Sequence, residues 1–343
     1  MNWSQFKLGV GPMSSTVVDA CLKYSYAHDF PLMFIASRNQ VDYDTGYAFR
    51  TKGLVDFIKN SKFYNKDRIK ICRDHCGPNF SEKDASLDYY NQVESCKKTI
   101  TTDLENGFDL IHIDVSRVDA EKQANLAECL IEHALQIDKN IALEFGSEDN
   151  TGQNLSDSLA VVDSHINFAS NYSKNIKFIV NQTGSLTKHT QVGVFNSELS
   201  KRISDKLHKY GFLFKEHNAD YLTKSQVATH KNSGVDSINI APQLGYTHTH
   251  VLSRLSYHFE KEFEYFKAYV LEQGMWKKWV VDSVRDDETK FLVSAHYFFN
   301  SEYSMLINDM LKKKKLPFEE MIYDELSIVL DQYRLGYLEN DIR

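Results

Sequence analysis

The sequence predicts an α/β protein, a (β/α)8 barrel (TIM barrel) with a C-terminal helical extension. Short apolar runs alternate with longer amphipathic segments, which is the pattern of parallel strands joined by crossover helices. The alternation repeats eight times within about 250 residues, the repeat number and length of a TIM barrel. Beyond about residue 255 the alternation stops, and only helix-like segments rich in aromatic residues follow.

The eight expected strands are short, apolar and followed by polar or glycine-containing turns. They lie at residues 8–10, 32–36, 69–73, 110–113, 141–145, 178–180, 212–215 and 237–240. The segments between them have apolar residues at helical spacing and polar residues at their starts. These helices are expected at residues 14–28, 51–60, 86–106, 120–137, 156–172, 197–210 and 223–232. We therefore place the barrel at residues 1–255.

The remaining residues, 256–343, are expected to form a helical extension packed on the barrel. Four helices are predicted, at residues 257–273, 289–300, 302–315 and 318–335, with Pro317 and Gly336 as interruptions. Their aromatic residues recur at helical spacing, which favours packing against the barrel or a contact between subunits over a cofactor site.

Composition excludes several classes of function. The chain has 343 residues and a net charge of -7, and no basic stripe interleaved with aromatic residues, so it has no general attraction for nucleic acid. No apolar run approaches the ~20 residues of a membrane span, and the first residues lack the apolar core of a signal peptide. A cytoplasmic protein is therefore expected. Five cysteines, an odd number, fit reduced thiols better than a disulfide framework.

Residues 69–80 are the most informative stretch of the sequence. A β-branched run leads into Asp74 and His75, and Gly77-Pro78 ends it. A carboxylate and an imidazole at a strand end are suited to metal binding and proton transfer. Taken alone, the dipeptide is better explained by a buried strand whose Asp caps a turn, so the evidence for a site comes from the other strand ends.

Polar or ionisable residues follow six successive predicted strands, and the carboxyl ends of barrel strands share one rim. They are Asn39, Gln40, Asp74, His75, Asp114, Glu144, Gln182, Glu216 and His217. Two histidines from different strands with carboxylate or amide oxygens between them suit a divalent ion such as zinc. His112 is interpreted as a core residue. A site role for His248 and His250 stays open.

Other catalytic classes have little support. Phosphate loops, GxGxxG segments and serine nucleophile elbows are absent from the sequence. A Schiff-base lysine is conceivable only at Lys215, which precedes His217 by two residues and points the same way in a strand. A metal-free aldolase mechanism through Lys215 therefore stays as an alternative.

Several of these segments resemble the tagatose-bisphosphate aldolase subunit family usually labelled non-catalytic or accessory. The similar segments are Ser37-Arg38-Asn39-Gln40-Val41 with Gly46-Tyr47, Asp74-His75-Cys76-Gly77-Pro78-Asn79, Gly107-Phe108 with Ile111-His112-Ile113-Asp114, Glu216-His217-Asn218-Ala219-Asp220-Tyr221, Ile322-Tyr323-Asp324, and Tyr333-Arg334-Leu335-Gly336. The segment that begins at Glu216 is one residue shorter than the corresponding segment of the family. More distantly, the order Asp-His, Glu, His resembles class II fructose-bisphosphate aldolases, which are zinc barrels. The loop after Glu144 is shorter than in members of the subunit family. The Gly-Gly-Ser-Gly phosphate loop of the class II aldolases is missing from this chain.

The resemblance implies roles for specific residues. It implies Zn2+ or another divalent cation bound by His75 and His217, with Gln182 at the position of the third ligand. It implies Asp74 as the proton-transfer acid or base and Glu144 as a second acid/base or ligand. The residues expected to orient substrate hydroxyls are Asn39, Gln40, Asp114, Gln182 and Asp220.

The leading hypothesis is a metal-dependent carbohydrate enzyme that uses reversible aldol chemistry on a ketose or ketose phosphate. It would be a tagatose-bisphosphate aldolase-like lyase or, if cleavage, rotation and re-addition occur on the enzyme, a C4 epimerase. One alternative is an accessory subunit that stabilises a separate catalytic class II aldolase. A weaker alternative is a sugar-binding module without turnover. The expected partners are a sugar or sugar phosphate and either an aldolase subunit or further copies of this chain.

Overall fold

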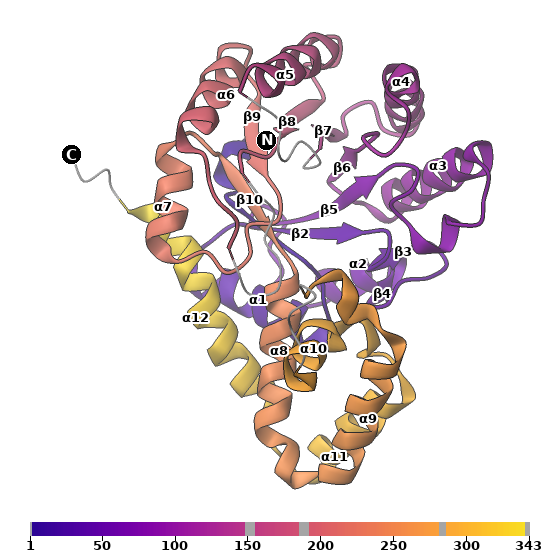
Figure 1. Cartoon of the computed structure of the whole chain (residues 1–343), viewed down its shortest axis with the longest axis vertical. Coiled ribbons are helices and arrows are strands. Elements are labelled where there is room, and N and C mark those ends of the chain that lie inside the picture. The colour runs from indigo at the N-terminus through magenta and orange to yellow at the C-terminus, as the bar shows by residue number, and fades with distance from the viewer. Residues whose placement is uncertain (1, 148–154, 185–191, 281–285, 340–343) are drawn as a thin grey trace.

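The computed structural model describes residues 2–147, 155–184, 192–280 and 286–339, and its centre is a closed barrel of parallel strands (Figure 1). The strand order around the barrel is β1-β10-β9-β8-β7-β6-β5-β2, which confirms the predicted TIM barrel. The barrel strands are β1 (Leu8–Val10), β2 (Leu32–Ser37), β5 (Ile69–Cys76), β6 (Leu110–Ile113), β7 (Ala142–Gly146), β8 (Ile176–Val180), β9 (Leu213–Glu216) and β10 (Ser237–Ile240).

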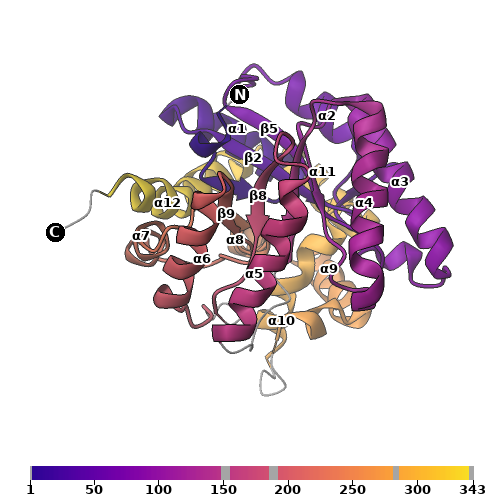
Figure 2. The ribbon, with the colours of Figure 1, turned by 90° about the horizontal axis from the view of Figure 1, so that it is seen from above.

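Helices connect successive strands and surround the barrel, as Figure 2 shows from above. They are α1 (Ser15–His28), α2 (Thr51–Lys59), α3 (Tyr89–Asn106), α4 (Ala120–Ile137), α5 (Leu155–Ser170), α6 (Ser197–Lys209), α7 (Lys224–Asn232) and α8 (Pro242–Leu255). Helix α3 begins three residues later than predicted. The reason is its N-cap, because the Asp88 side chain accepts a hydrogen bond from the Asn91 N–H at 2.9 Å.

A small two-stranded parallel sheet was not predicted. It pairs β3 (Val41–Asp42) with β4 (Phe49–Arg50) in the connection between β2 and α2. Strands of two residues contain no periodicity that sequence analysis can detect. The sheet fixes the path of the chain after β2, where Asn39 and Gln40 were expected to face the barrel mouth.

The barrel interior has an apolar floor below a polar layer. The buried side chains of the floor come from the N-terminal segment and from five of the barrel strands: Trp3, Phe6, Met33, Ile35, Cys72, Leu110, Ala142 and Phe178. Alternating residues along a strand point to the same face, so the next inward positions on β6, β7 and β9 bring His112, Glu144 and Lys215 above this floor. The apolar floor therefore excludes water beneath the polar groups.

The C-terminal part is helical, as predicted. Its helices are α9 (Glu260–Gln273), α10 (Asp287–Ser294), α11 (Glu302–Lys313) and α12 (Phe318–Leu338). Helices α9 to α11 lie together at one end of the molecule, whereas α12 runs back along α1, α7 and α8 (Figure 1). The division into domains at residues 255 and 256 stays a prediction. Among the described residues, none of the helices combines the length and apolar character that a membrane crossing requires.

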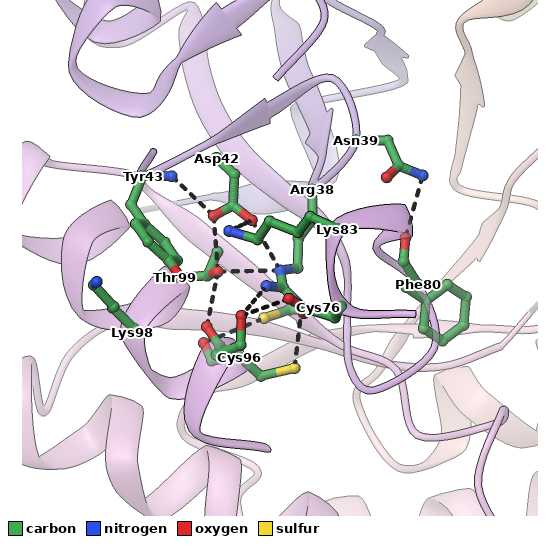
Figure 3. A network of polar contacts seen from close by, with 12 residues as sticks. Arg38, Asn39, Asp42, Tyr43, Cys76, Phe80, Lys83, Cys96, Lys98 and Thr99 are labelled. Atoms are coloured by element: carbon green, nitrogen blue, oxygen red, sulfur yellow. Dashed lines mark hydrogen bonds and ion pairs between the residues drawn. The ribbon is translucent and has the colours of Figure 1, made fainter. Parts of the chain in front are cut away.

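A buried network of charged and polar groups ties the segment after β2 to the segment after β5 and to α3 (Figure 3). At its centre is Arg38, whose side chain is almost fully buried. Its guanidinium contacts Asp42 at 3.2 Å and Asp84 at 2.6 Å, and donates to the Ser95 hydroxyl at 2.7 Å. The network thus holds two connections that border the barrel mouth.

We predict that Arg38→Met lowers the free energy of unfolding by about 3–5 kcal/mol, because buried Asp84 loses its ion pair and buried Asp42 loses one of its two, keeping that with Lys83 at 2.9 Å. Urea denaturation measures the change. As a control, Lys52→Met removes the exposed Lys52–Asp56 pair on α2 and should cost less than about 1 kcal/mol. A loss below about 1 kcal/mol for Arg38→Met would show that the network does not stabilise the fold.

Candidate functional site

Asp74 and His75 both face the barrel mouth because the backbone of β5 is irregular at this point. In a regular strand, neighbouring side chains point to opposite faces. Here His75 has a left-handed φ of 45°, and the pairing of β5 with β6 shifts register between Arg73 and Cys76. The shift brings Asp74 Oδ2 within 3.8 Å of His75 Nε2. A left-handed non-glycine residue is strained, and such strain concentrates at functional sites.

Four side chains form a compact candidate metal centre at the barrel mouth. Asp74, His75, His112 and His217 each place one ligand atom within 4.8 Å of the others. His75 Nε2 lies 3.3 Å from His217 Nδ1, and Asp74 Oδ1 lies 3.5 Å from His217 Nδ1. A tetrahedral zinc ion with Zn–N bonds of about 2.0–2.1 Å separates its ligand atoms by about 3.3 Å. The observed separations therefore fit a single small cation.

Each imidazole has a hydrogen-bond acceptor on the side away from the cluster. The pairs are His75 Nδ1 with Asp114 Oδ2 at 2.7 Å, His217 Nε2 with Glu144 Oε1 at 2.7 Å, and His112 Nε2 with the Gly146 carbonyl oxygen at 2.9 Å. Metal-binding histidines have this kind of support, which fixes the tautomer and the ring orientation. With the protons on these outer nitrogens, the inner nitrogens present lone pairs to the cluster.

Two lone pairs at this distance repel each other, so either a proton or a metal ion has to lie between His75 Nε2 and His217 Nδ1. Among the described residues, the carboxylates of Asp74, Asp114 and Glu144 share the cluster with one ammonium group, that of Lys215. When the three imidazoles are neutral, the cluster therefore carries two negative charges in excess. A divalent cation would neutralise this excess and bind both lone pairs.

The role of His112 differs from that of the other two histidines. Its Nδ1 accepts the backbone N–H of His75 at 3.2 Å and lies 3.4 Å from Asp74 Oδ1. Coordination through this nitrogen would require the His75 N–H to release it. The best-placed ligands are therefore His75 Nε2, His217 Nδ1 and Asp74, with His112 as a fourth ligand or as a group that orients the Asp74–His75 segment.

The charges of the cluster shift several pKa values. Burial alone would raise the pKa of Asp74, but the neighbouring His75 and His217 rings hold it well below its usual range. Burial also opposes ionisation of Glu144, yet the Lys215 ammonium lowers its pKa to about 2. Burial lowers the pKa of His112, but the Glu144 carboxylate and the hydrogen bond to Asp74 raise it above its ordinary value. The carboxylates are thus ionised at neutral pH.

Glu144 and Asp114 lie behind the histidines. Glu144 is 1% exposed, and its two oxygens contact Lys215 Nζ at 2.6 Å and His217 Nε2. Asp114 Oδ2 is hydrogen-bonded to His75 Nδ1, and Asp114 Oδ1 accepts hydrogen bonds from the N–H and the hydroxyl of Ser116. Their proton-transfer and substrate-binding roles stay predictions, and the contacts favour orientation of the ligand histidines instead.

Three residues expected to bind substrate make structural contacts. Asn39 links two loops, since its amide donates to the Phe80 carbonyl and accepts from the Glu82 N–H. Gln40 accepts from the Ser37 N–H through Oε1. Asp220 Oδ1 accepts from two N–H groups at the start of α8, those of Ala241 and Gln243. In each of these three side chains, at least one polar atom is therefore already hydrogen-bonded within the protein.

Two carboxamides flank His217. Gln182 follows β8 and Asn239 belongs to β10, the strands on either side of β9, and Gln182 lines a small cavity together with His217. Asn239 is 3% exposed and points into the barrel, where a side chain at Gly9 would collide with it. Among the described residues, Gln182 Oε1 and both polar atoms of the Asn239 side chain have no hydrogen-bond partner. These atoms are available to a ligand in the mouth.

Sequence analysis missed His112 and Asn239 as members of the site. His112 is buried, as expected, but it points into the barrel with the cluster. The two-residue spacing between His112 and Asp114, which places both on one face of a strand, was the available signal. For Asn239 the signal was a polar residue between two isoleucines of the strand, Ile238 and Ile240.

Other predicted candidates lie elsewhere. Glu216 faces away from the cluster and accepts from the Thr183 N–H, and burial raises its pKa to about 7. His248 stacks on Phe299 and contacts the Ser14 hydroxyl at 2.9 Å, while His250 is exposed on α8. Most of the polar loop after Glu144, residues 148–154, lies outside the described residues.

Comparison with known proteins agrees with the sequence resemblance. A family model described as "D-tagatose-1,6-bisphosphate aldolase subunit GatZ/KbaZ-like" matches residues 8–151. The resemblance to this aldolase subunit family is therefore confirmed for that part of the chain, which includes Asp74, His75 and Glu144. His217 lies outside the matched residues.

Solved structures with a similar fold cover nearly the whole chain. A probable tagatose 6 phosphate kinase from Sinorhizobium meliloti 1021 has a TM-score of 0.81 at 15% identity, covering 96% of this chain and 100% of its own. The fructuronate-tagaturonate epimerase UxaE from Cohnella laeviribosi has a TM-score of 0.60 at 10% identity, covering 96% and 81%. A fructose-bisphosphate aldolase from Campylobacter jejuni has a TM-score of 0.58 at 11% identity, covering 97% and 91%. At these identities the similarity shows the fold.

We predict that the purified chain binds about one zinc ion, and that His75→Ala and His217→Ala each weaken binding at least about 100-fold, because each removes a ligand. Equilibrium dialysis followed by metal analysis measures both. The exposed His250→Ala serves as the control and should leave binding unchanged. Stoichiometric zinc retained by both site variants would exclude this ligand set.

Proposed function

We propose that the protein is a metal-dependent carbohydrate enzyme that performs reversible aldol chemistry on a ketose or ketose phosphate. The observation that carries the proposal is the buried centre in which His75 Nε2 and His217 Nδ1 face each other among three carboxylates. This arrangement supports one divalent ion at the mouth of the barrel, where enzymes of this fold bind their substrates. The match to an aldolase subunit family supports the same reaction class.

A divalent ion such as zinc would supply Lewis acidity that polarises a substrate carbonyl and stabilises an enediolate. His75, His217 and Asp74 would hold the ion, and either His112 or Gln182 would complete the set. Asp114 and Glu144 would keep the two ligand histidines in the required tautomers.

Proton transfer is assigned to Asp74 in preference to Glu144. Asp74 is 8% exposed at the mouth, while Glu144 lies deeper at 1% and has both oxygens occupied. A general base must reach the proton that it abstracts, and of the three described carboxylates of the cluster Asp74 is the most accessible from the mouth. Gln182 and Asn239 would bind substrate hydroxyls, because their free carboxamide atoms can both donate and accept hydrogen bonds.

The reaction has two outcomes. Cleavage of the C3–C4 bond followed by release of both fragments is an aldolase reaction. Cleavage, rotation of the bound aldehyde and re-addition yield the C4 epimer. Both outcomes need the same acid/base group and the same stabilised enediolate, so the residues described above serve either.

The metal-free alternative through Lys215 is less compatible with the structure. A Schiff-base lysine must reach a substrate carbonyl as the free amine. Lys215 is 1% exposed and its ammonium pairs with Glu144 at 2.6 Å, below the histidines.

An accessory subunit remains the second candidate, because the matching family model describes an aldolase subunit. A pure scaffold has no need for a buried set of histidines and carboxylates. Stoichiometric zinc would therefore favour the enzyme over the scaffold, and sugar binding without any product would favour a binding module.

We predict zinc-dependent turnover of ketose bisphosphates, with kcat/KM lowered at least about 1000-fold in His75→Ala and His217→Ala, because a metal ion contributes several kcal/mol to such a reaction. Proton NMR of the products distinguishes three-carbon fragments from a C4 epimer. His250→Ala again serves as the control. Full activity in both site variants would refute the metal assignment.

A further inference from the structure

Lys215 is a buried cation inside the barrel, directly below the candidate metal centre. Its side chain is 1% exposed, and its ammonium group lies 5.2 Å from the centroid of the Phe178 ring, which belongs to the apolar floor. Among the described residues, its only ion pair is with Glu144 Oε2, at 2.6 Å. Burial of a lysine at this depth requires that partner.

Glu144 uses its two oxygens for different partners. Oε2 accepts from Lys215, while Oε1 accepts from His217 Nε2 at 2.7 Å. Lys215 and His217 are two residues apart at the end of β9 and point to the same face, so the Glu144 carboxylate from β7 bridges them across the barrel. The position of Glu144 is thus set by the ammonium on one side and the imidazole on the other.

This bridge determines which nitrogen of His217 faces the cluster. With Nε2–H donated to Glu144, Nδ1 is left as a lone pair 3.3 Å from His75 Nε2 and 3.5 Å from Asp74 Oδ1. The other two rings have acceptors of their own, and neither acceptor contacts Lys215. Glu144 Oε1 also lies 3.7 Å from His112 Nδ1, but its short contact is with His217, so Lys215 acts mainly on His217.

We propose that Lys215 is a positioning residue for metal binding, which acts by holding Glu144 where it orients His217. The inference rests on the proposed metal site and adds a residue that touches neither the ion nor the substrate. Without the ammonium group, the remaining partners of the buried Glu144 carboxylate are two imidazoles, His217 Nε2 at 2.7 Å and His112 Nδ1 at 3.7 Å, and the carboxylate is drawn away from His217 toward water. His217 then loses the acceptor that keeps Nδ1 directed at the ion.

The test compares zinc affinity in wild type, Lys215→Met and the double variant Lys215→Met/Glu144→Gln, with zinc chloride as the probe in competition with a chromophoric chelator. Lys215→Met should weaken zinc binding about 10- to 100-fold, the usual effect of losing support behind a metal ligand. The double variant should return to within a few-fold of the wild type. Its new carboxamide oxygen, in place of the Glu144 carboxylate, can still accept from His217 Nε2–H, and it needs no counter-charge.

Lys70→Met is the matched control. Lys70 is also buried, and it contacts Asp109 at 3.3 Å near the start of β5. This variant removes a buried ammonium group from the opposite end of a strand, so it should lower stability without changing zinc affinity.

Each outcome decides between the hypotheses. If the wild-type protein binds no zinc, both the proposed function and the role of Lys215 are contradicted. Wild-type binding with equal affinity in Lys215→Met would overturn only the role of Lys215, and so would a double variant that is not rescued. If Lys215→Met does not fold, the double variant decides alone: near wild-type affinity supports the role, and lost affinity contradicts it.

Discussion

The contact between His75 Nε2 and His217 Nδ1 is the constraint on which the rest of the site depends. Both rings have a carboxylate at their other nitrogen, so the two inner nitrogens lie 3.3 Å apart in a negatively charged setting. Such an arrangement is unfavourable in a protein interior unless a proton or a metal ion lies between the nitrogens. The fold nevertheless holds the two imidazole rings in these positions, through hydrogen bonds to Asp114 and Glu144 and through the irregular end of β5.

The barrel supplies the support in layers. An apolar floor removes water, a charged layer of Lys215 and Glu144 lies above it, and the histidines and Asp74 occupy the mouth. Around the mouth, the Arg38 network fixes the connections after β2 and β5. The left-handed backbone at His75 is the local cost of directing two adjacent side chains to one place. Rigid support on several sides explains how the ligand atoms can be held at the separations that a small ion requires.

The sequence predicted the fold well because the evidence for a barrel is repeated eight times along the chain. The structure brings Asp74, His75 and His217 together, as expected for polar residues at strand ends that converge on one rim, and their roles stay predictions. The sequence could not show which polar side chains also have structural partners. Asp220 and Asn39 were expected to bind substrate, but they hydrogen-bond backbone groups of neighbouring segments. His112 was taken for core because its position within a strand gave no sign that it contacts Asp74.

The central claim is that imidazole nitrogens of His75 and His217 bind one divalent ion. X-ray absorption spectroscopy of the zinc-loaded protein tests it most directly, because the spectrum reports the ligand atoms themselves. The account predicts a first shell of nitrogen and oxygen at about 2.0–2.1 Å, with multiple scattering from at least two imidazoles that decreases in His217→Ala. A shell of sulfur, or of oxygen alone with no imidazole scattering, would contradict it.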